Sequence, residues 1–114
     1  MDAIANITYE FDEKNGNGSK IATAEILDTD TWDEYGTFTL PISNPTPEYY
    51  SDTMTDSDME TWVAIAESNL KLQVLDTTLH NPFGDGKRYG FKNVKIEEAN
   101  IGIFHIVAQV VRKP

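Results

Sequence analysis

The chain has 114 residues, of which 39% are hydrophobic and 25% charged, a composition that predicts one small folded domain over residues 1–114. Nineteen acidic and nine basic side chains give a net charge of −10, which argues against a protein held on nucleic acid or an anionic membrane by counterion release. Because the sequence contains no cysteine, it excludes a disulfide framework, a thiolate zinc site and a cysteine nucleophile.

Alternating apolar side chains predict three strands in the first part of the chain. The first runs over residues 3–11, and a connection with two Asn-Gly pairs, residues 12–19, predicts a hairpin turn. A second strand is expected over 20–27, without a clear division between its two faces. A third is expected over 37–42, where prolines end the ladder by removing backbone donors.

One helix is expected over residues 56–69. It follows two irregular acidic loops and precedes the C-terminal strands. The loops are expected over 28–36 and 43–55. Ser57 and Glu60 have the spacing of a capping box at a helix start. Apolar residues then recur at helical spacing on one face, namely Met59, Trp62, Val63, Ala66 and Leu70.

The remaining chain is expected to return to strands, over 70–76, 88–96 and 101–111, with a loop at 80–87. The last strand has apolar residues on both faces, which predicts that both faces are covered, as in a central strand or an interface strand. The expected fold is mainly β (α+β), an antiparallel β-sandwich or barrel of about six strands with one flanking α-helix.

No constellation of residues predicts catalysis, a metal or a cofactor, so the protein is not expected to be an enzyme. His105 lies in an apolar strand, which favours a packed or interface histidine, and His80 lies at a strand end beside a turn. Four carboxylates between Asp28 and Glu34 favour calcium chemically, but Trp32 occupies the fifth position and no glycine the sixth, which does not fit an EF-hand loop.

Charge is distributed unevenly along the chain. Residues 1–70 carry 15 acidic and 2 basic side chains, whereas residues 71–114 carry 4 acidic and 7 basic ones. The acidic block could be a solvated loop, a surface that repels or imitates DNA, or one half of a head-to-tail contact. The candidate interface residues are acidic Asp28, Asp30, Asp33 and Glu34, and basic Lys87, Arg88, Lys92 and Lys95.

The C-terminal half resembles phage-type tail tube subunits, a family that includes the tubes of contractile injection machines. The resemblance rests on the helix near 59–68, the expected strand Leu70-Lys71-Leu72-Gln73-Val74-Leu75-Asp76, the loop with Gly84-Asp85-Gly86, and the segment Tyr89-Gly90-Phe91-Lys92-Asn93-Val94-Lys95-Ile96-Glu97-Glu98-Ala99. It covers about 55 residues and includes no catalytic signature. The N-terminal half fits less well, because the connection over 12–19 is shorter than the long hairpin of those subunits.

The resemblance implies a non-enzymatic structural subunit of a tail tube or head-to-tail connector, assembled in the host cytoplasm into a hexameric ring of the virion. DNA would pass an acidic surface without binding, and other tail or neck proteins would be the partners. Since no secretion signal or membrane segment is expected, no membrane partner is expected either. Two alternatives remain open: an acidic DNA-mimic inhibitor of a host protein, and a small carbohydrate- or calcium-binding β-sandwich.

Overall fold

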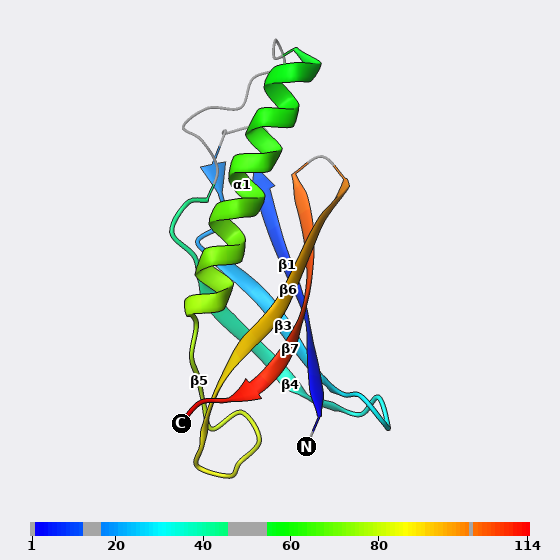
Figure 1. The fold of residues 1–114 in the computed structure, drawn as a ribbon, viewed down its shortest axis with the longest axis vertical. Helices are drawn as coiled ribbons and strands as arrows, with labels where there is room; N and C mark the ends of the chain where they lie inside the picture. The colour runs from blue at the N-terminus through cyan, green and yellow to red at the C-terminus, as the bar shows by residue number, and fades with distance from the viewer. Residues whose placement is uncertain (1, 13–16, 46–54, 101) are drawn as a thin grey trace.

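The computed structural model describes residues 2–12, 17–45, 55–100 and 102–114. Seven strands and one helix occupy these ranges (Figure 1). They are β1 (Ala3–Asp12), β2 (Asn17–Gly18), β3 (Ile21–Asp28), β4 (Glu34–Pro41), α1 (Asp56–Asp76), β5 (Leu79–His80), β6 (Arg88–Asn100) and β7 (Ile103–Arg112).

The strands form one antiparallel sheet in the order β4-β3-β1-β7-β6-β5, and the short β2 pairs with β1. The sheet curls into a half-barrel, and α1 runs along its open side (Figure 1). The structure therefore confirms the expected mainly β fold with α+β character. Of the two predicted architectures, the curled sheet corresponds to the barrel, since one sheet provides both walls.

Alternation along the strands separates an inner face from an outer face. In β1, Ala5, Ile7 and Tyr9 are buried, whereas Asn6 and Glu10 are exposed, which confirms the strand predicted over 3–11. The same period resolves the orientation of β3. Its inner residues are Ala22, Ala24 and Ile26, and its outer residues are Ile21, Thr23 and Glu25.

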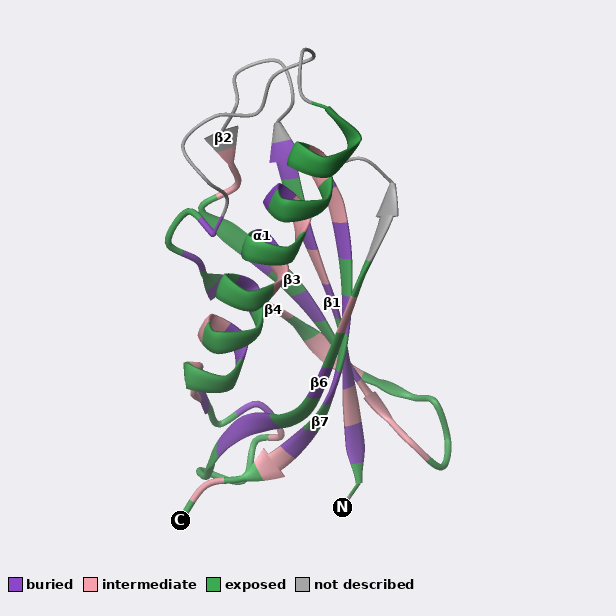
Figure 2. Ribbon diagram, turned by 45° about the horizontal axis from the view of Figure 1, so that its top comes forward, coloured by how far each residue is buried: buried purple, intermediate pink, exposed green. Residues whose placement is uncertain are grey.

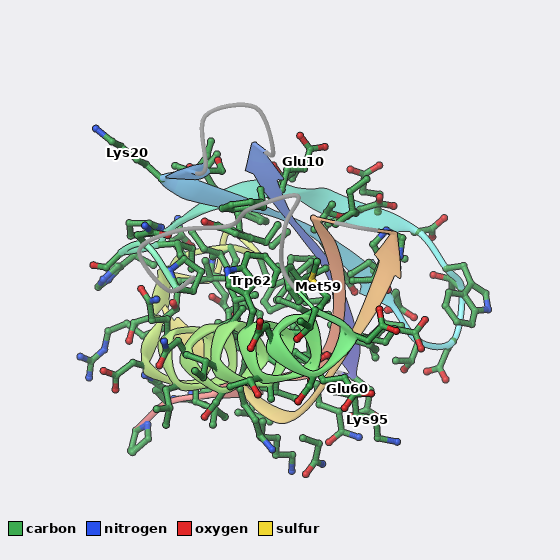
Figure 3. All side chains as sticks on the ribbon, turned by 90° about the horizontal axis from the view of Figure 1, so that it is seen from above. Glu10, Lys20, Met59, Glu60, Trp62 and Lys95 are labelled. Carbon is green, nitrogen blue, oxygen red and sulfur yellow. The ribbon has the colours of Figure 1, made fainter. Side chains whose placement is uncertain are left out.

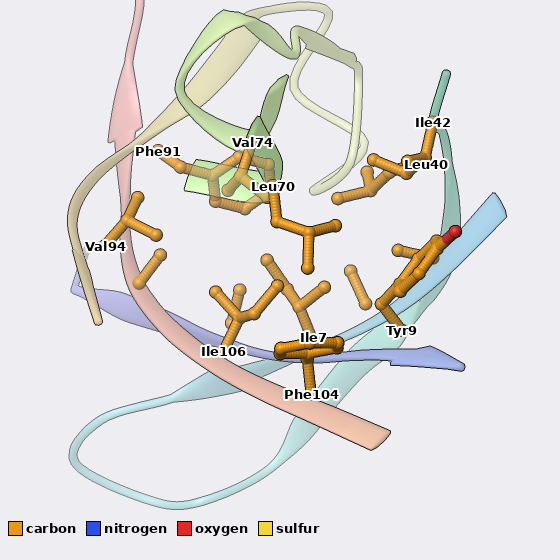
Figure 4. Packing of buried hydrophobic residues seen from close by; sticks show 14 of the residues in the cluster. Ile7, Tyr9, Leu40, Ile42, Leu70, Val74, Phe91, Val94, Phe104 and Ile106 are labelled. Carbon is orange, nitrogen blue, oxygen red and sulfur yellow. The ribbon is translucent and has the colours of Figure 1, made fainter. Parts of the chain in front are cut away.

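The core lies between the inner face and α1 (Figures 2 and 4). Trp62 is 2% exposed, and its ring contacts those of Phe11 and Phe104 at centroid distances of 4.9 and 6.3 Å. Leu70 and Val74 point from the helix toward the sheet, where Figure 4 places them above Ile7, Ile106 and Phe104. The helix thus supplies the apolar layer that a half-barrel cannot supply alone.

The helix begins at a capping box different from the predicted one. Thr55 is the N-cap: its hydroxyl accepts a hydrogen bond from the Asp58 N–H at 3.1 Å, and the Asp58 carboxylate accepts one from the Thr55 N–H at 3.3 Å. The predicted capping pair, Ser57 and Glu60, was wrong. Thr55 and Asp58 are also three residues apart, so spacing alone does not distinguish the two pairs. Ser57 already lies in the first turn, where its carbonyl accepts from the Thr61 hydroxyl.

The helix also continues beyond its predicted end at residue 69, to Asp76, and the strand predicted over 70–76 is wrong. Leu70 and Val74 lie one turn apart on the buried face and are each 0% exposed. Leu72, which a strand would place on the same face as both, is 64% exposed. The segment fits both periods, and it contains neither glycine nor proline to end a helix that has begun.

The last two strands lie where the sequence predicts them, with shifted bounds: β7 spans Ile103–Arg112 instead of 101–111. β6 extends to Asn100 instead of 96, and its register shifts between Lys92 and Lys95, where Asn93 adopts a positive φ of 52°. β7 lies between β1 and β6, which confirms a central strand. Its inner face is buried as expected, through Phe104, Ile106, Ala108 and Val110.

The outer face of β7 is not covered within the described ranges, because Val107 is 45% exposed. The prediction that both faces of this strand are covered is therefore wrong for the single chain, and the interface alternative stays a prediction. The apolar outer residue at 101 lies outside the described residues.

Of the two predicted acidic loops, the first is shorter than expected and the second lies mostly outside the described residues. β3 extends to Asp28 and β4 begins at Glu34, so a turn of residues 29–33 replaces the predicted loop 28–36. Within 43–55, residues 46–54 lie outside the described ranges, as do residues 13–16 of the predicted hairpin connection. The loop before β6 is present between His80 and Arg88, as predicted.

Candidate assembly surface

The turn between β3 and β4 is organised by one carboxylate. Asp28 Oδ1 accepts hydrogen bonds from the backbone N–H groups of Asp30 and Thr31, at 2.8 and 3.0 Å. Its Oδ2 accepts one from the Tyr35 hydroxyl at 2.7 Å. An aspartate in this position satisfies turn donors that the ladder cannot reach, which explains why the predicted loop shortens to a hairpin turn. Asp28 is thus a structural residue of the turn.

Trp32 stands at the tip of this turn. Its backbone φ is 62°, in the left-handed region that bulky residues rarely adopt, and its side chain is 64% exposed. The Trp32 N–H donates to the Asp28 carbonyl at 2.9 Å, and the Asp28 N–H donates to the Asp33 carbonyl at 2.9 Å, so the tip is held in place. We call residues 28–34 the Trp32 turn; it displays an aromatic side chain flanked by exposed Asp30, Asp33 and Glu34.

A second aspartate–tyrosine pair lies in the loop before β6. The Tyr89 hydroxyl donates to Asp85 Oδ2, and the Phe83 ring contacts the rings of Tyr35 and Tyr89 edge-on, at centroid distances of 4.7 and 4.6 Å. The three rings therefore connect the Trp32 turn to the loop of residues 81–87. The contact of both tyrosines with Phe83 is not recognisable from the sequence, because Tyr35 is distant from Phe83 along the chain and reaches it only in the folded sheet.

These hydrogen bonds shift the pKa of all four groups. Accepted hydrogen bonds lower the pKa of Asp28, mainly from the Thr31 N–H and the Tyr35 hydroxyl, and the Tyr89 hydroxyl lowers the pKa of Asp85. The same bonds raise the pKa of Tyr35 and Tyr89, since ionised phenols could not donate to the carboxylates. In the core, burial raises the pKa of Tyr9 to about 12.

We expect stability to fall at both ends of the pH range. A carboxyl whose folded pKa is lowered stabilises the fold above its unfolded pKa, so the free energy of unfolding should decrease as the pH falls below about 4. A phenol whose folded pKa is raised stabilises the fold below its unfolded pKa, so the same quantity should decrease above about pH 10. Urea unfolding at a series of pH values measures both limbs.

The control is a double variant, Tyr35→Phe with Tyr89→Phe, which keeps the rings and removes both hydroxyls. Its acid limb should be shallower than that of the wild type, and its alkaline limb smaller but still present because Tyr9 remains. An unchanged acid limb in this variant would show that the two pairs do not carry the pH dependence.

The acidic and basic predicted interface residues belong to elements that are not adjacent in the strand order, although Thr29 of the Trp32 turn and Lys92 line the same surface hollow. Exposed carboxylates occur on β1, β3, β4 and the Trp32 turn, such as Glu10, Glu25 and Glu34, and also on α1 and in the loop before β6, such as Asp58, Glu60 and Asp85. All four predicted basic residues belong to β6 or the loop before it, and are Lys87, Arg88, Lys92 and Lys95, all exposed. Figure 3 shows Glu10 and Lys95 projecting from different sides of the molecule.

Some charges depart from this division. Lys20 precedes β3 on the acidic side, and Glu97 lies on β6 on the basic side. Arg88 also has a role within the chain, since its Nη2 donates to the Pro114 carbonyl at 2.9 Å. The structure brings together the acidic residues of one turn, but it does not bring the four basic residues into one cluster.

A groove crosses the outer face of the sheet beside the bulge in β6. One hollow of about 450 Å³ is lined by Ile4, Val107 and Lys95 among others, and an adjoining hollow of about 300 Å³ is lined by Lys92. Both hollows share Ile4 and Gln109. The Asn93 side-chain amide donates to Gln109 Oε1 at 2.8 Å and braces the groove across β6 and β7. We call this feature the outer-face groove; sequence alone does not predict it, because the bulge creates it.

The remaining sequence candidates are not assembled into a chemical site. His105 is exposed on the outer face, opposite Thr8 and Glu97 in the ladder, so the prediction of a packed histidine was wrong for the single chain. His80 is exposed on β5. Within the described ranges, no three His, Asp or Glu side chains are grouped as metal ligands. No helix described in the structure is long and apolar enough to span a bilayer.

Comparison with protein-family models, with curated proteins and with solved structures finds no match for this chain. The fold and the distribution of charged and aromatic side chains on its surface are therefore the basis for inferring function.

Proposed function

We propose that this protein is a non-enzymatic structural subunit that assembles head to tail with copies of itself into a ring. The place of such a ring would be a phage-like tail tube or a head-to-tail connector, in keeping with the resemblance of the C-terminal half. The observation that carries the proposal is that exposed Asp30, Asp33 and Glu34 lie at the β3–β4 turn, whereas exposed Lys92 and Lys95 lie on β6, which is not adjacent to β3 or β4 in the strand order.

The sheet topology supports the same proposal. β4 is at one end of the strand order, and among the described residues it pairs only with β3. Near the other end, β6 pairs with β5 only at Tyr89 and Arg88, and the rest of its length has β7 as its one described strand partner. The two ends of the sheet are different surfaces, so contact between them is heterologous and closes into a ring when the rotation permits.

An acidic surface also suits a channel for DNA. Carboxylates repel phosphates, so DNA would pass such a wall without adsorbing to it. The proposed partners are copies of this chain and other tail or neck proteins, and the proposed setting is the virion, with assembly in the host cytoplasm. A hexamer is the ring size that the family resemblance implies.

Sedimentation velocity over a range of protein concentrations and salt tests the proposal. At about 0.1 M salt we expect an oligomer larger than a dimer, and the fraction of the protein in that oligomer should rise with protein concentration. Toward about 1 M salt the oligomer should dissociate, because the Debye length falls from about 10 to about 3 Å. Negative-stain electron microscopy of the low-salt sample should show rings.

A chain that remains monomeric at every concentration and salt would overturn the proposal. The DNA-mimic alternative makes the opposite prediction, because an inhibitor of that kind stays monomeric alone and binds a basic DNA-binding protein one to one. Titration of the monomer with such a partner, monitored by calorimetry, then decides for the alternative.

A further inference from the structure

We infer that the Trp32 turn of one copy seats in the outer-face groove of a second copy. The inference rests on the proposed self-assembly and names the contact that produces it. Its occupant is a second copy of this chain, because the turn and the groove each have an apolar centre and carry charged side chains of opposite sign.

The Trp32 turn has the properties of an anchor. Its indole is 64% exposed and is held on a left-handed backbone, so the fold accepts both conformational strain and apolar exposure at one position. The tip is braced by hydrogen bonds through Asp28, so little conformational freedom remains to be lost on binding. Tryptophan presented in this way is the residue type most enriched among binding hot spots.

The groove has the properties of a receptor for that anchor. Ile4 and Val107 contribute apolar surface to its lining, and Val107 is 45% exposed in the single chain. The two adjoining hollows, of about 450 and 300 Å³, make it long enough to take a side chain together with its flanking turn. The hydrogen bond between Asn93 and Gln109 keeps the wall in place before anything binds.

The charges of the groove and of the turn are complementary, which favours the Trp32 turn as the occupant. Asp30 and Asp33 flank Trp32 on the turn, whereas Lys92 and Lys95 line the groove. Seating the turn would place carboxylates beside ammonium groups and would bring the indole face within reach of a lysine, a favourable arrangement for both pairs. Asp2 and Thr29 of the chain's own Trp32 turn also line one end of the groove, so the turn of the second copy is expected to lie toward the Lys95 end, away from both.

Two variants test the contact, one in the turn and one in the groove. Trp32→Asn removes the indole and keeps a residue that tolerates the left-handed backbone, and Lys95→Glu reverses the charge of the groove while the hydrophobic lining stays. Each variant alone should associate at least about tenfold more weakly than the wild type, measured by sedimentation equilibrium at low salt. An equimolar mixture should form a heterodimer, because the first variant keeps an intact groove and the second an intact turn.

Matched controls separate this contact from a general loss of surface. Leu72→Gln replaces a helical side chain with the same 64% exposure as Trp32, and Lys71→Glu reverses another exposed lysine on α1; both should assemble like the wild type. Thermal unfolding of the monomeric variants checks that each one is folded.

The outcomes distinguish this contact from the proposed function. If the wild type assembles and both Trp32→Asn and Lys95→Glu assemble equally well, the contact is wrong while self-assembly stands. A wild type that is monomeric under all conditions overturns both. If the wild type forms only a dimer, and either variant abolishes that dimer, the contact is supported, with each copy's turn in the other copy's groove. The same result overturns the ring.

Discussion

Replacing Leu70 with alanine should destabilise the protein by about 2–5 kcal/mol, while the same change at Leu72 should alter stability by less than about 0.5 kcal/mol. Leu70 is fully buried against the sheet, so its truncation loses transfer free energy and leaves a cavity. Leu72 is 64% exposed, and alanine is a better helix former than leucine. Urea unfolding of the two variants measures the difference.

The pair also tests the helical extension directly. In a strand over 70–76, Leu70 and Leu72 would share one face and the two substitutions would have similar costs. Equal losses of stability would therefore contradict the helix from Asp56 to Asp76. Val74→Ala provides a second reading, since a fully buried Val74 one turn after Leu70 should also be costly to truncate.

Replacing Gly18 with alanine should cost at least about 2 kcal/mol, within the usual range for overpacking a core. A Cβ at this position would lie 1.9 Å from the Tyr9 hydroxyl oxygen, and the Tyr9 side chain is fully buried and cannot move aside cheaply. The short strand β2 would have to separate from β1 to relieve the contact. Thermal or urea unfolding measures the loss.

Tyr9→Phe is the diagnostic second substitution. Among the described residues the Tyr9 hydroxyl has no hydrogen-bond partner, so its removal alone should not destabilise the protein. In the Tyr9→Phe background, Gly18→Ala should cost less, although contact with the ring carbon at 3.0 Å remains. Gly84→Ala is the control, because a Cβ there meets open space and only the backbone conformation resists it. Strict additivity of the two substitutions would show that the Tyr9 contact is not the cause.

The long strands β1, β3, β4, β6 and β7 could be predicted from their apolar alternation, whereas the two-residue strands β2 and β5 could not, because they are too short to show a period. In β1 and β7 the apolar residues alternate cleanly, and the structure places them on the inner face as the period requires. The end of α1 could not be predicted, since Leu70, Leu72 and Val74 satisfy a strand and Leu70 and Val74 also satisfy a helix. Packing against the sheet decides between the two periods, and that information is absent from a local window.

Of the candidate site, only the charged residues could be predicted from the sequence. The structure places the acidic Trp32 turn and the basic residues of β6 on elements that are not adjacent in the strand order, but the exposed carboxylates of α1 do not follow this division. The exposure of Trp32 at the tip of a turn could not be predicted, because it follows from a turn that Asp28 organises through its hydrogen bonds. The outer-face groove depends on a register shift in β6, and hydrophobic periodicity carries no signal for a bulge.

The contrast between the two tryptophans provides separate optical reporters of folding and association. Trp62 is 2% exposed in the core and Trp32 is 64% exposed at a surface tip, and they are the two tryptophans of the sequence. Fluorescence from Trp62 follows the integrity of the core, whereas quenching of Trp32 by a soluble collider follows access to the tip. A single unlabelled sample therefore reports, at different sensitivities, whether the chain is folded and whether its surface is occupied.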